Sequence, residues 1–338
     1  MKVLFHAEQL NYRGTTNSVV DYARYNQEIL GNESAIVYDL DSSGIAGFEI
    51  GSNPKVIEYI KTLFPVYTYN SVDQLNDIAS KFDVCYSQRA GVKVDHTTLN
   101  GKKIVKPIVT STKFGVHAVF QWYEPHGDVY AYISEWLSKA VHKNYETKEL
   151  PPFVPYIVDL PQPIWNMRQM LGIPEDKIVI GRLGGFGTFD IEFVKRTVYD
   201  IVNERDDIVF LFAHTLPFYT HPNIIHVDAF FDQQTKSDFI CSCDAMLHGR
   251  ELGESFGLAI SEFLFHNKPV LAWSGGFDKN HVHMLQHTGL LYDDEKQLRE
   301  KLLSIRDYKN SNYKAIVESF TPANVMNKFN EVFLYGIK

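Results

Sequence analysis

The sequence has few cysteines, no long hydrophobic run and no excess of basic residues. Its three cysteines, Cys85, Cys241 and Cys243, are an odd number and predict no disulfide framework, so we interpret them as buried thiols in a reducing compartment. Cys241 and Cys243 are too close in sequence to form an ordinary metal-binding knuckle. No apolar stretch reaches the length of about 20 residues that a membrane-spanning helix needs. The first residues do not resemble a signal peptide, and we expect a cytoplasmic protein with, at most, peripheral membrane contact.

The charge balance excludes a further class. The chain has 33 basic and 41 acidic residues, which gives a net charge of −8. Because a nucleic-acid-binding domain is usually basic, this balance argues against nucleic acid as a partner, although a local basic cleft can still hold a phosphate. Lys102, Lys103 and Lys106 form a small basic group, which we interpret as a solvated loop, with a membrane surface or an anionic acceptor as the alternative contact.

Length and periodicity predict two α/β domains. A chain of 338 residues exceeds a single hydrophobic core, which stops growing at about 250–300 residues. Short apolar segments alternate with stretches of helical spacing, a pattern typical of βαβ units and a parallel sheet. The strands that this pattern predicts include residues 3–5, 35–38, 84–86, 108–109, 178–180, 208–212, 246–247 and 270–272.

Five prolines between residues 151 and 163 mark the division between these domains, because proline at this density prevents both a helix and a central strand. We therefore predict a first Rossmann-like domain over 1–155 and a second over 164–321. Apolar residues at helical spacing predict an amphipathic helix within 322–338.

The segment from His248 to Glu262 carries the most chemical information. It follows an apolar strand and leads into a helix that we expect to begin near Ser255 to Gly257. The free N–H groups and dipole of such a helix start favour a phosphate. Glu254 before the helix and Glu262 within it are carboxylates suited to sugar hydroxyls. The alternative is that Glu254 is only a helix-terminal charge and Glu262 a solvated helix residue.

This segment resembles the E-x-x-x-x-x-x-x-E region of family 4 glycosyltransferases, which have the GT-B fold of two Rossmann-like domains facing across a cleft. The resemblance rests on ordered matches: Glu254 to Glu262 with Phe256-Gly257-Leu258 between them, Lys268-Pro269-Val270, Gly275-Gly276 and Thr288-Gly289-Leu290-Leu291. It implies that the second domain binds the nucleotide-sugar donor and that the C-terminal helix crosses back to the first, acceptor-side domain.

The resemblance also implies roles for individual residues. In the second domain, Arg182 would grip the donor diphosphate, Glu262 the ribose hydroxyls and Glu254 the hydroxyls of the donor sugar. The chain from Ser255 through Phe256 and Gly257 to Leu258 would contact the diphosphate through its backbone. The family usually has a lysine six residues after the arginine, where this sequence has Thr188, so another base such as Arg250 would have to substitute.

In the first domain, the resemblance places Gly14 in a strand-to-helix turn that would touch phosphate or acceptor, with Thr15 or Thr16 capping the helix in the alternative reading. His117 would contact the transferred sugar. His126 is a rival for that role, and a structural role is the alternative for both histidines. His214 at the end of a strand is interpreted as structural, with a place beside the nucleotide as the alternative.

The implied reaction is a retaining hexosyl or pentosyl transfer. The donor would be a nucleotide-diphosphate sugar, UDP- or GDP-linked, and the acceptor a hydroxyl of a glycan, lipid or other saccharide. The protein would stabilise the leaving diphosphate electrostatically, without a metal ion or another cofactor. Asp39-Leu40-Asp41 has the spacing of a metal-binding D-x-D motif, but we interpret it as the start of a loop.

Four alternatives stay open. The chain could be another GT-B enzyme, such as an epimerase or a phosphorylase, or a catalytically inactive sugar-binding or scaffold protein, which Thr188 favours. A Rossmann dehydrogenase fits less well, because residues 181–187 are glycine-rich without the ordered G-x-G-x-x-G. Transfer to DNA bases is disfavoured by the net charge.

Overall fold

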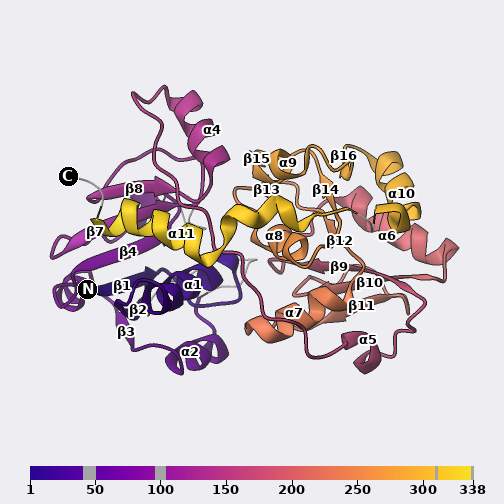
Figure 1. Cartoon of the computed structure of the whole chain (residues 1–338), viewed down its shortest axis with the longest axis horizontal. Coiled ribbons are helices and arrows are strands. Elements are labelled where there is room, and N and C mark those ends of the chain that lie inside the picture. The colour runs from indigo at the N-terminus through magenta and orange to yellow at the C-terminus, as the bar shows by residue number, and fades with distance from the viewer. Residues whose placement is uncertain (41–50, 96–103, 309–310, 336–338) are drawn as a thin grey trace. The chain divides into compact units, whose positions relative to one another are not determined.

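The computed structural model describes residues 1–40, 51–95, 104–308 and 311–335. The chain divides into two compact units, one made of Met1–Ile157 with Phe320–Lys338 and the other of Val158–Ser319. Each unit contains a six-stranded parallel sheet with helices packed against it (Figure 1). The predicted α/β class with two Rossmann-like domains is therefore confirmed. The predicted boundaries at 155, 164 and 321 lie close to those of the units.

The first sheet has the strand order β3-β2-β1-β4-β7-β8, with every neighbouring pair parallel. These strands are β1 (Lys2–Ala7), β2 (Glu33–Asp39), β3 (Val66–Tyr69), β4 (Val84–Arg89), β7 (Lys113–Ala118) and β8 (Val129–Tyr132). The helices of this unit are α1 (Gly14–Glu28), α2 (Pro54–Lys61), α3 (Val72–Ala79), α4 (Glu135–Tyr145) and α11 (Pro322–Phe329). β5 (Val94–Asp95) and β6 (Ile104–Val105) form a separate antiparallel pair.

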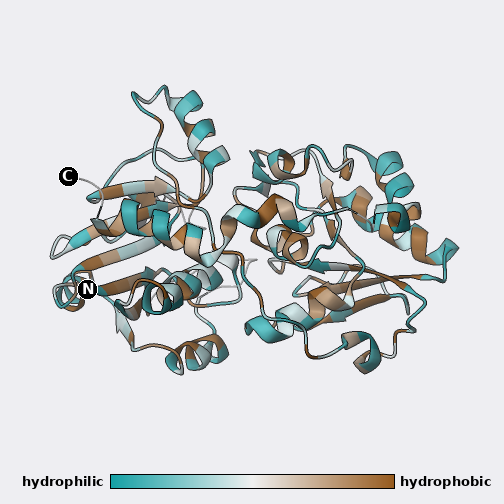
Figure 2. Cartoon of the chain, viewed as in Figure 1, coloured by the Kyte–Doolittle hydropathy of each residue, from teal (hydrophilic) through white to brown (hydrophobic). Residues whose placement is uncertain are grey.

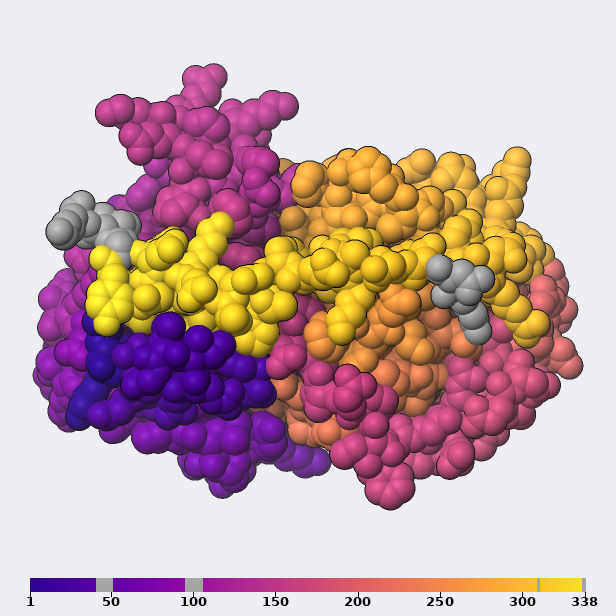
Figure 3. All heavy atoms as spheres, viewed as in Figure 1, coloured from indigo at the N-terminus to yellow at the C-terminus, as the bar shows by residue number. Residues whose placement is uncertain are grey.

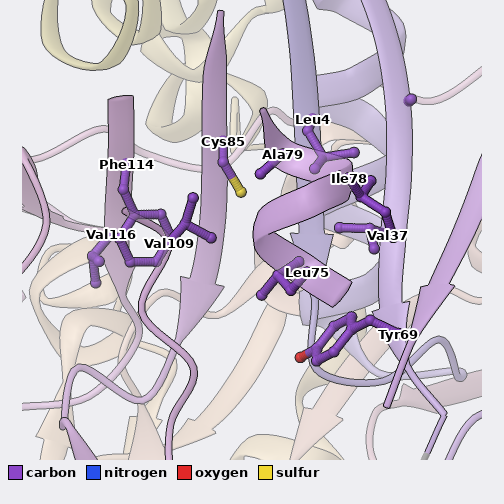
Figure 4. Packing of buried hydrophobic residues seen from close by; sticks show 11 residues of the cluster. Leu4, Val37, Tyr69, Leu75, Ile78, Ala79, Cys85, Val109, Phe114 and Val116 are labelled. Carbon is purple, nitrogen blue, oxygen red and sulfur yellow. The ribbon is translucent and has the colours of Figure 1, made fainter. Parts of the chain in front are cut away.

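Both faces of the first sheet are buried, which is why its central strands are largely hydrophobic (Figure 2). On one face, side chains from β1, β2, β4 and β7 pack against Leu75, Ile78 and Ala79 of α3 (Figure 4). On the other face, Phe5 of β1 stacks on Phe329 of α11 with ring centroids 6.2 Å apart. The C-terminal helix thus completes the core of the first unit, although it is separated from that unit in sequence by the whole second unit.

One predicted strand of the first unit is wrong. Residues 108–109 are not in a strand; Val109 instead packs as irregular chain into the core. The strand is β7, a few residues later, and it contains His117. The pattern of β7 is interrupted by Gly115, which hid it from the sequence analysis. Gly115 is required there because a Cβ would come within 2.7 Å of the Phe333 ring.

The second sheet repeats the order of the first, as β11-β10-β9-β12-β14-β16. Its strands are β9 (Ile178–Leu183), β10 (Ile208–Ala213), β11 (Ile224–Val227), β12 (Ala245–His248), β14 (Val270–Trp273) and β16 (Leu291–Tyr292). β13 (Gly253–Glu254) and β15 (Asp278–Lys279) form a separate, short parallel pair. The α-helices are α5 (Met167–Met170), α6 (Glu192–Glu204), α7 (Gln233–Ser242), α8 (Leu258–Phe265), α9 (Asn280–Leu285) and α10 (Glu295–Leu303), and 3-10 turns follow at Ile305–Tyr308 and Lys314–Phe320.

The proline-rich segment has no helix, as expected, but it is not an exposed linker. Val154, Ile157 and Val158 are buried, and Phe153 bridges to Tyr132 at the end of β8. The prediction for the cysteines needs a smaller correction. Cys85 and Cys243 are buried, whereas Cys241 is only half-buried, with its Sγ 3.3 Å from Nδ1 of His266.

The C-terminal helix lies within the predicted range and changes character along its length. α11 begins at Pro322, with Thr321 as its N-cap, and from Asn330 to Tyr335 the chain continues as a π-helical turn. Phe329 and Phe333 reach the first core from these two turns. Within the described ranges, no helix has both the length and the apolar character needed to cross a membrane.

The contact at Gly115 generates a prediction. Gly115→Ala should lower the free energy of unfolding by about 1–3 kcal/mol, because the new methyl group overpacks against Phe333. Denaturant unfolding followed by circular dichroism measures the loss. In a Phe333→Leu background the same substitution should cost less, because the atom it meets is gone. An equal cost in both backgrounds would show that the Phe333 contact is not the reason for the glycine.

Candidate functional site

The strand order of the second sheet reverses between β9 and β12. β10 and β11 lie on one side of β9, whereas β14 and β16 lie beyond β12 on the other. The loops after β9 and β12 therefore leave the carboxyl edge in opposite directions, and open α/β sheets bind ligands in the crevice at this switch point. The predicted donor residues follow these two strands, so the fold brings them to the same edge.

Glu254 is the centre of a charged cluster at this edge. Its Oε2 accepts a hydrogen bond from Arg250 at 2.9 Å, and its Oε1 lies 3.5 Å from Nε2 of His248. Its backbone N–H donates to Nδ1 of His281 at 3.2 Å. Burial alone would raise the pKa of Glu254, but Arg250 and the two histidines hold that pKa at about 2. At neutral pH the carboxylate therefore only accepts hydrogen bonds and cannot act as a proton donor.

The histidines beside Glu254 differ in what they can do. Nδ1 of His281 accepts the Glu254 N–H, so its Nε2 carries the proton and donates to the Trp273 carbonyl at 2.8 Å. Burial and the neighbouring His248 lower the pKa of His281 to about 4, which keeps this ring neutral. His248 packs against it with ring centroids 4.8 Å apart, and within the described chain neither of its nitrogens has a hydrogen-bond partner. Both nitrogens of His248 are buried, and its Nε2 lies beside the Glu254 carboxylate.

Arg182 is the last residue but one of β9 and is buried. Its guanidinium donates to Oγ1 of Thr215 at 2.5 Å and to Oγ1 of Thr188 at 2.8 Å. It also donates to the Gly185 carbonyl at 3.1 Å. Burial lowers the pKa of Arg182 to about 10, so the side chain stays charged at neutral pH. Arg182 therefore ties the glycine-rich loop after β9 to the loop after β10, and Thr188 is part of its support.

The start of α8 lies directly after Glu254. Gly257 is the N-cap of α8, with a φ of 88° that a residue with a side chain rarely adopts. Asn280 supports this turn by donating to the Phe256 carbonyl at 2.6 Å. The predicted residues Ser255, Phe256 and Leu258 complete the turn and open the helix. As predicted, the helix start presents its first N–H groups beside a carboxylate at the ligand edge.

Glu262 is neither solvated nor exposed to a ligand surface in this structure. It lies inside α8, is buried, and accepts a hydrogen bond from the Lys236 ammonium of α7 at 2.7 Å. Burial raises the pKa of Glu262 and the lysine opposes that rise. The predicted contact of Glu262 with a ribose stays a prediction, and it would require the carboxylate to share Lys236 with the ligand or to leave it.

The first unit holds the remaining predicted residues. Gly14 is the first residue of α1 and does not lie in the turn before the helix. The N-cap of α1 is Arg13, not Thr15 or Thr16. The Thr16 hydroxyl accepts from the Asn11 N–H at 3.1 Å. Gly14 thus lies where β1 leads into α1, but its contact with a phosphate or acceptor stays a prediction.

His117 lies within the core of the first unit. Its ring is fully buried, its Nδ1 is 2.6 Å from the Tyr86 hydroxyl, and Phe333 packs against it. Burial lowers the pKa of His117 to about 3. His126 is also buried, with Nδ1 bonded to the Glu124 carbonyl at 2.7 Å. This is the environment of structural histidines, and a sugar contact for either residue stays a prediction from the resemblance.

The switch point of the first sheet, between β1 and β4, carries a buried polar cluster that the sequence analysis missed. Nδ1 of His6 lies 2.7 Å from the Ser87 hydroxyl and Nε2 lies 2.8 Å from the Tyr69 hydroxyl. Arg89 donates to the same Ser87 hydroxyl and to the Pro107 carbonyl. Burial, Arg89 and Lys106 lower the pKa of His6. Lys106 itself pairs with Glu8 at 3.1 Å, so it is not the solvated group that was expected; Lys102 and Lys103 lie outside the described residues.

Other residues of the second site were also missed, because only the fold reveals them. His281 and Asn280 are remote in sequence from Glu254, and Lys279 is paired with Glu254 in the β13–β15 register. The glycine turn at 274–276 was the one signal that pointed to this neighbourhood. Asp39 ends β2, and Asp41 lies outside the described residues. Among the described residues, no group of histidine, cysteine, aspartate or glutamate is arranged to hold a metal ion.

Comparison with solved structures gives matches over the whole chain. HepE from Anabaena in complex with UDP and glucose matches with a TM-score of 0.70 at 14% identity, over 98% of each chain. A glycosyltransferase from Rickettsia africae matches with a TM-score of 0.68 at 14% identity, over 99% of each chain. A putative UDP-N-acetylglucosamine 2-epimerase from Listeria monocytogenes matches with a TM-score of 0.61 at 11% identity, over 100% of this chain and 97% of the other.

No family model matches the sequence, and comparison with curated proteins finds no match. At such low identities the structural likeness shows the fold alone, which is the GT-B fold that the sequence resemblance implied.

The low pKa of Glu254 predicts how stability depends on pH. The pKa lies at about 2 in the folded chain and at the ordinary 4.5 once its partners are lost, so the unfolded chain binds more protons in this range. Stability from Glu254 is present above pH 4.5 and is lost as the pH falls towards 2. As the pH falls from 4.5 to 2, the free energy of unfolding should decrease less in Glu254→Gln than in wild type. The difference between the two decreases should be about 1–3 kcal/mol.

Urea unfolding at a series of pH values measures this difference. The exposed Glu251 of the same loop is the matched control, and Glu251→Gln should follow the wild type. Identical pH profiles for Glu254→Gln and wild type would contradict the charged cluster around Glu254.

Proposed function

We propose that the chain is a glycosyltransferase that takes a sugar from a nucleotide-diphosphate sugar and transfers it to an acceptor hydroxyl. The observation that carries this proposal is the pairing of two features at the second switch point. An ionised carboxylate, Glu254, lies immediately before the N-terminal turn of α8. A helix start suits a diphosphate and a carboxylate suits sugar hydroxyls, and a nucleotide sugar carries both groups joined to one another.

The charges near this site suggest how the diphosphate would be neutralised. Arg182 uses its hydrogen bonds on the loops after β9 and β10. Its proposed role is therefore to position these loops and to contribute positive charge near the diphosphate. Arg250 has a side chain 25% exposed and is the cation placed beside Glu254. We propose that it replaces the lysine that the resemblance expects at Thr188. Lys279, exposed and in register with Glu254, is the second cation available.

The chemistry follows from this arrangement. The leaving diphosphate would be stabilised by Arg250 and by the first N–H groups of α8 as charge develops on it. Glu254, fixed by Arg250 and His281, would accept hydrogen bonds from the sugar and orient its anomeric carbon. His248 would support the ionised Glu254 through the 3.5 Å contact of its Nε2 with Oε1. Glu262 with Lys236 would hold the ribose. Retention of configuration and independence of metal ions are carried over from the resemblance to family 4.

UDP is the donor nucleotide that we propose first, because the similar HepE structures hold UDP or UDP-glucose. The acceptor is proposed to be a saccharide or a lipid-linked saccharide. Epimerisation of a UDP-linked N-acetyl sugar is the second candidate function, and the likeness to the putative epimerase from Listeria monocytogenes favours it over a phosphorylase.

The first test is a calorimetric titration of UDP, GDP, ADP and CMP into the purified chain. UDP should bind saturably, and Arg250→Ala should weaken it at least about tenfold, because a cation that contacts the diphosphate is lost. Glu262→Gln should also weaken it, whereas Glu251→Ala should not. Failure of the folded protein to bind any of the four nucleotides would contradict the donor site and favour the scaffold alternative.

The second measurement separates transfer from epimerisation. UDP-glucose and UDP-N-acetylglucosamine are incubated with the chain and a mixture of saccharide acceptors, and products are followed by proton NMR. A transferase releases free UDP and forms a new α-linked or β-linked product whose anomeric coupling reports retention. Conversion of the N-acetyl sugar at C2 with UDP still attached would instead identify an epimerase.

A further inference from the structure

A group of exposed aromatic side chains lies on the segment that leaves the carboxyl end of β7. Phe120, Trp122 and Tyr145 are 38%, 52% and 44% exposed. Tyr123 packs against Tyr145 and against Tyr130 of β8, with ring centroids 5.7 Å and 6.3 Å apart. We call these four residues the aromatic platform. Phe120, Trp122 and Tyr123 come from the loop between β7 and β8, and Tyr145 ends α4, which stands out from the body of the first unit (Figures 1 and 3).

The loop that carries the platform is fixed rather than loosely attached. The Trp122 carbonyl accepts a hydrogen bond from the Tyr132 hydroxyl at 2.6 Å, and the Glu124 carboxylate accepts one from the Lys93 N–H at 2.8 Å. Asn144 donates to the Gln121 side chain at 3.1 Å, which joins the loop to the end of α4. The indole of Trp122 is therefore presented to solvent from an anchored backbone, so little further order has to be imposed when a ligand binds.

The platform also belongs to the ligand edge of the first sheet. The loop begins where the Val119 N–H donates to the carbonyl of Arg89, the last residue of β4, at 3.0 Å. The Tyr130 hydroxyl, beneath the platform, donates to the carbonyl of Gly91 at 2.7 Å, just after the same strand. β4 is one of the two strands of the first switch point, where open parallel sheets bind their ligands.

The chemistry of the platform selects one kind of occupant. Flat aromatic faces carry negative charge density that attracts the C–H groups on the face of a sugar ring. The exposed polar groups beside these rings, Asn144 and Glu124, match the hydroxyl rim of a sugar. The charge around the platform is acidic, which opposes an anionic lipid surface: residues 120–150 contain five carboxylates and three lysines, namely Glu124, Asp128, Glu135, Glu146 and Glu149 against Lys139, Lys143 and Lys148.

We propose that the aromatic platform is a saccharide-binding site and that the acceptor of the reaction is an uncharged or cationic saccharide that stacks on Trp122. Naming this saccharide as the acceptor rests on the proposed function. The binding site itself does not, because a saccharide can be tested without any nucleotide.

The experiment measures binding of neutral saccharides to the full chain by saturation-transfer NMR and calorimetry. The panel is cellobiose, maltotriose, lactose and chitobiose, and the comparison ligand is a vesicle of phosphatidylcholine with phosphatidylglycerol. Wild type should bind at least one saccharide. Trp122→Ala and Tyr145→Ala should bind it at least about tenfold more weakly, which corresponds to about 1.4 kcal/mol, and Trp122→Phe should retain much of the affinity.

Trp165→Ala is the matched control, because Trp165 is 67% exposed but belongs to the second unit, and its binding should equal that of wild type. Circular dichroism verifies that each variant is folded. Three results would overturn the proposal: no saccharide binds, binding is unaffected by Trp122→Ala, or the vesicles bind in a Trp122-dependent way while the saccharides do not.

Nucleotide titration of the same variants separates this proposal from the proposed function. UDP should bind Trp122→Ala as it binds wild type, while transfer to the bound saccharide should be lost. Trp122-dependent saccharide binding in a chain that binds no nucleotide would leave the platform in place and remove the transferase. Nucleotide binding without saccharide binding would leave the proposed donor site in place and rule out the aromatic platform as a saccharide-binding site.

Discussion

The ligand edge of the second unit depends on the buried guanidinium of Arg182. A buried charge is costly unless its hydrogen bonds are made, and Arg182 makes them by drawing together the loop after β9 and the loop after β10. Two further contacts join the same loops: the Leu216 N–H donates to the Phe186 carbonyl at 2.8 Å, and Nδ1 of His214 lies 3.1 Å from the Gly184 carbonyl. The threonine that stands where the resemblance expects a lysine is one of the acceptors. Thr188, in place of the expected lysine, thus accepts a hydrogen bond from Arg182.

While Arg182 fixes the loops after β9 and β10, the loop after β12 carries the charged cluster around Glu254. Glu254 stays ionised because a cation and two imidazoles surround it, and the neutral His281 orients its backbone. The helix that follows begins at Gly257, whose left-handed conformation turns the chain at once from the carboxylate to the first N–H groups. The first unit has the same strand order but different residues at its switch point. Its switch point holds the His6, Ser87 and Arg89 cluster, and the aromatic platform lies at the same edge.

Local sequence rules predict the parts of this structure that are local. Apolar strands, the proline-rich segment and the start of α8 depend on neighbouring residues, and they lie where the sequence places them, within a few residues. β7 was missed because Gly115 and His117 break the apolar run, and the reason for both residues is a helix more than two hundred positions later. No sequence pattern indicated Lys236, which bonds Glu262, or His281, which bonds Glu254, because each partner is distant in sequence. Which side chains meet across a sheet edge follows from topology, and no spacing in one segment encodes it.

The proposed function requires that a nucleoside diphosphate binds at the start of α8 beside Glu254. Hydrogen–deuterium exchange with and without UDP tests it most directly, because the first N–H groups of the helix have no partner within the helix and would gain one from the ligand. Exchange should slow in peptides that cover residues 253–262, and Arg250→Ala should shift this protection to at least about tenfold higher UDP concentrations. Unchanged exchange in these peptides at saturating UDP, or protection confined to other parts of the chain, would contradict the account.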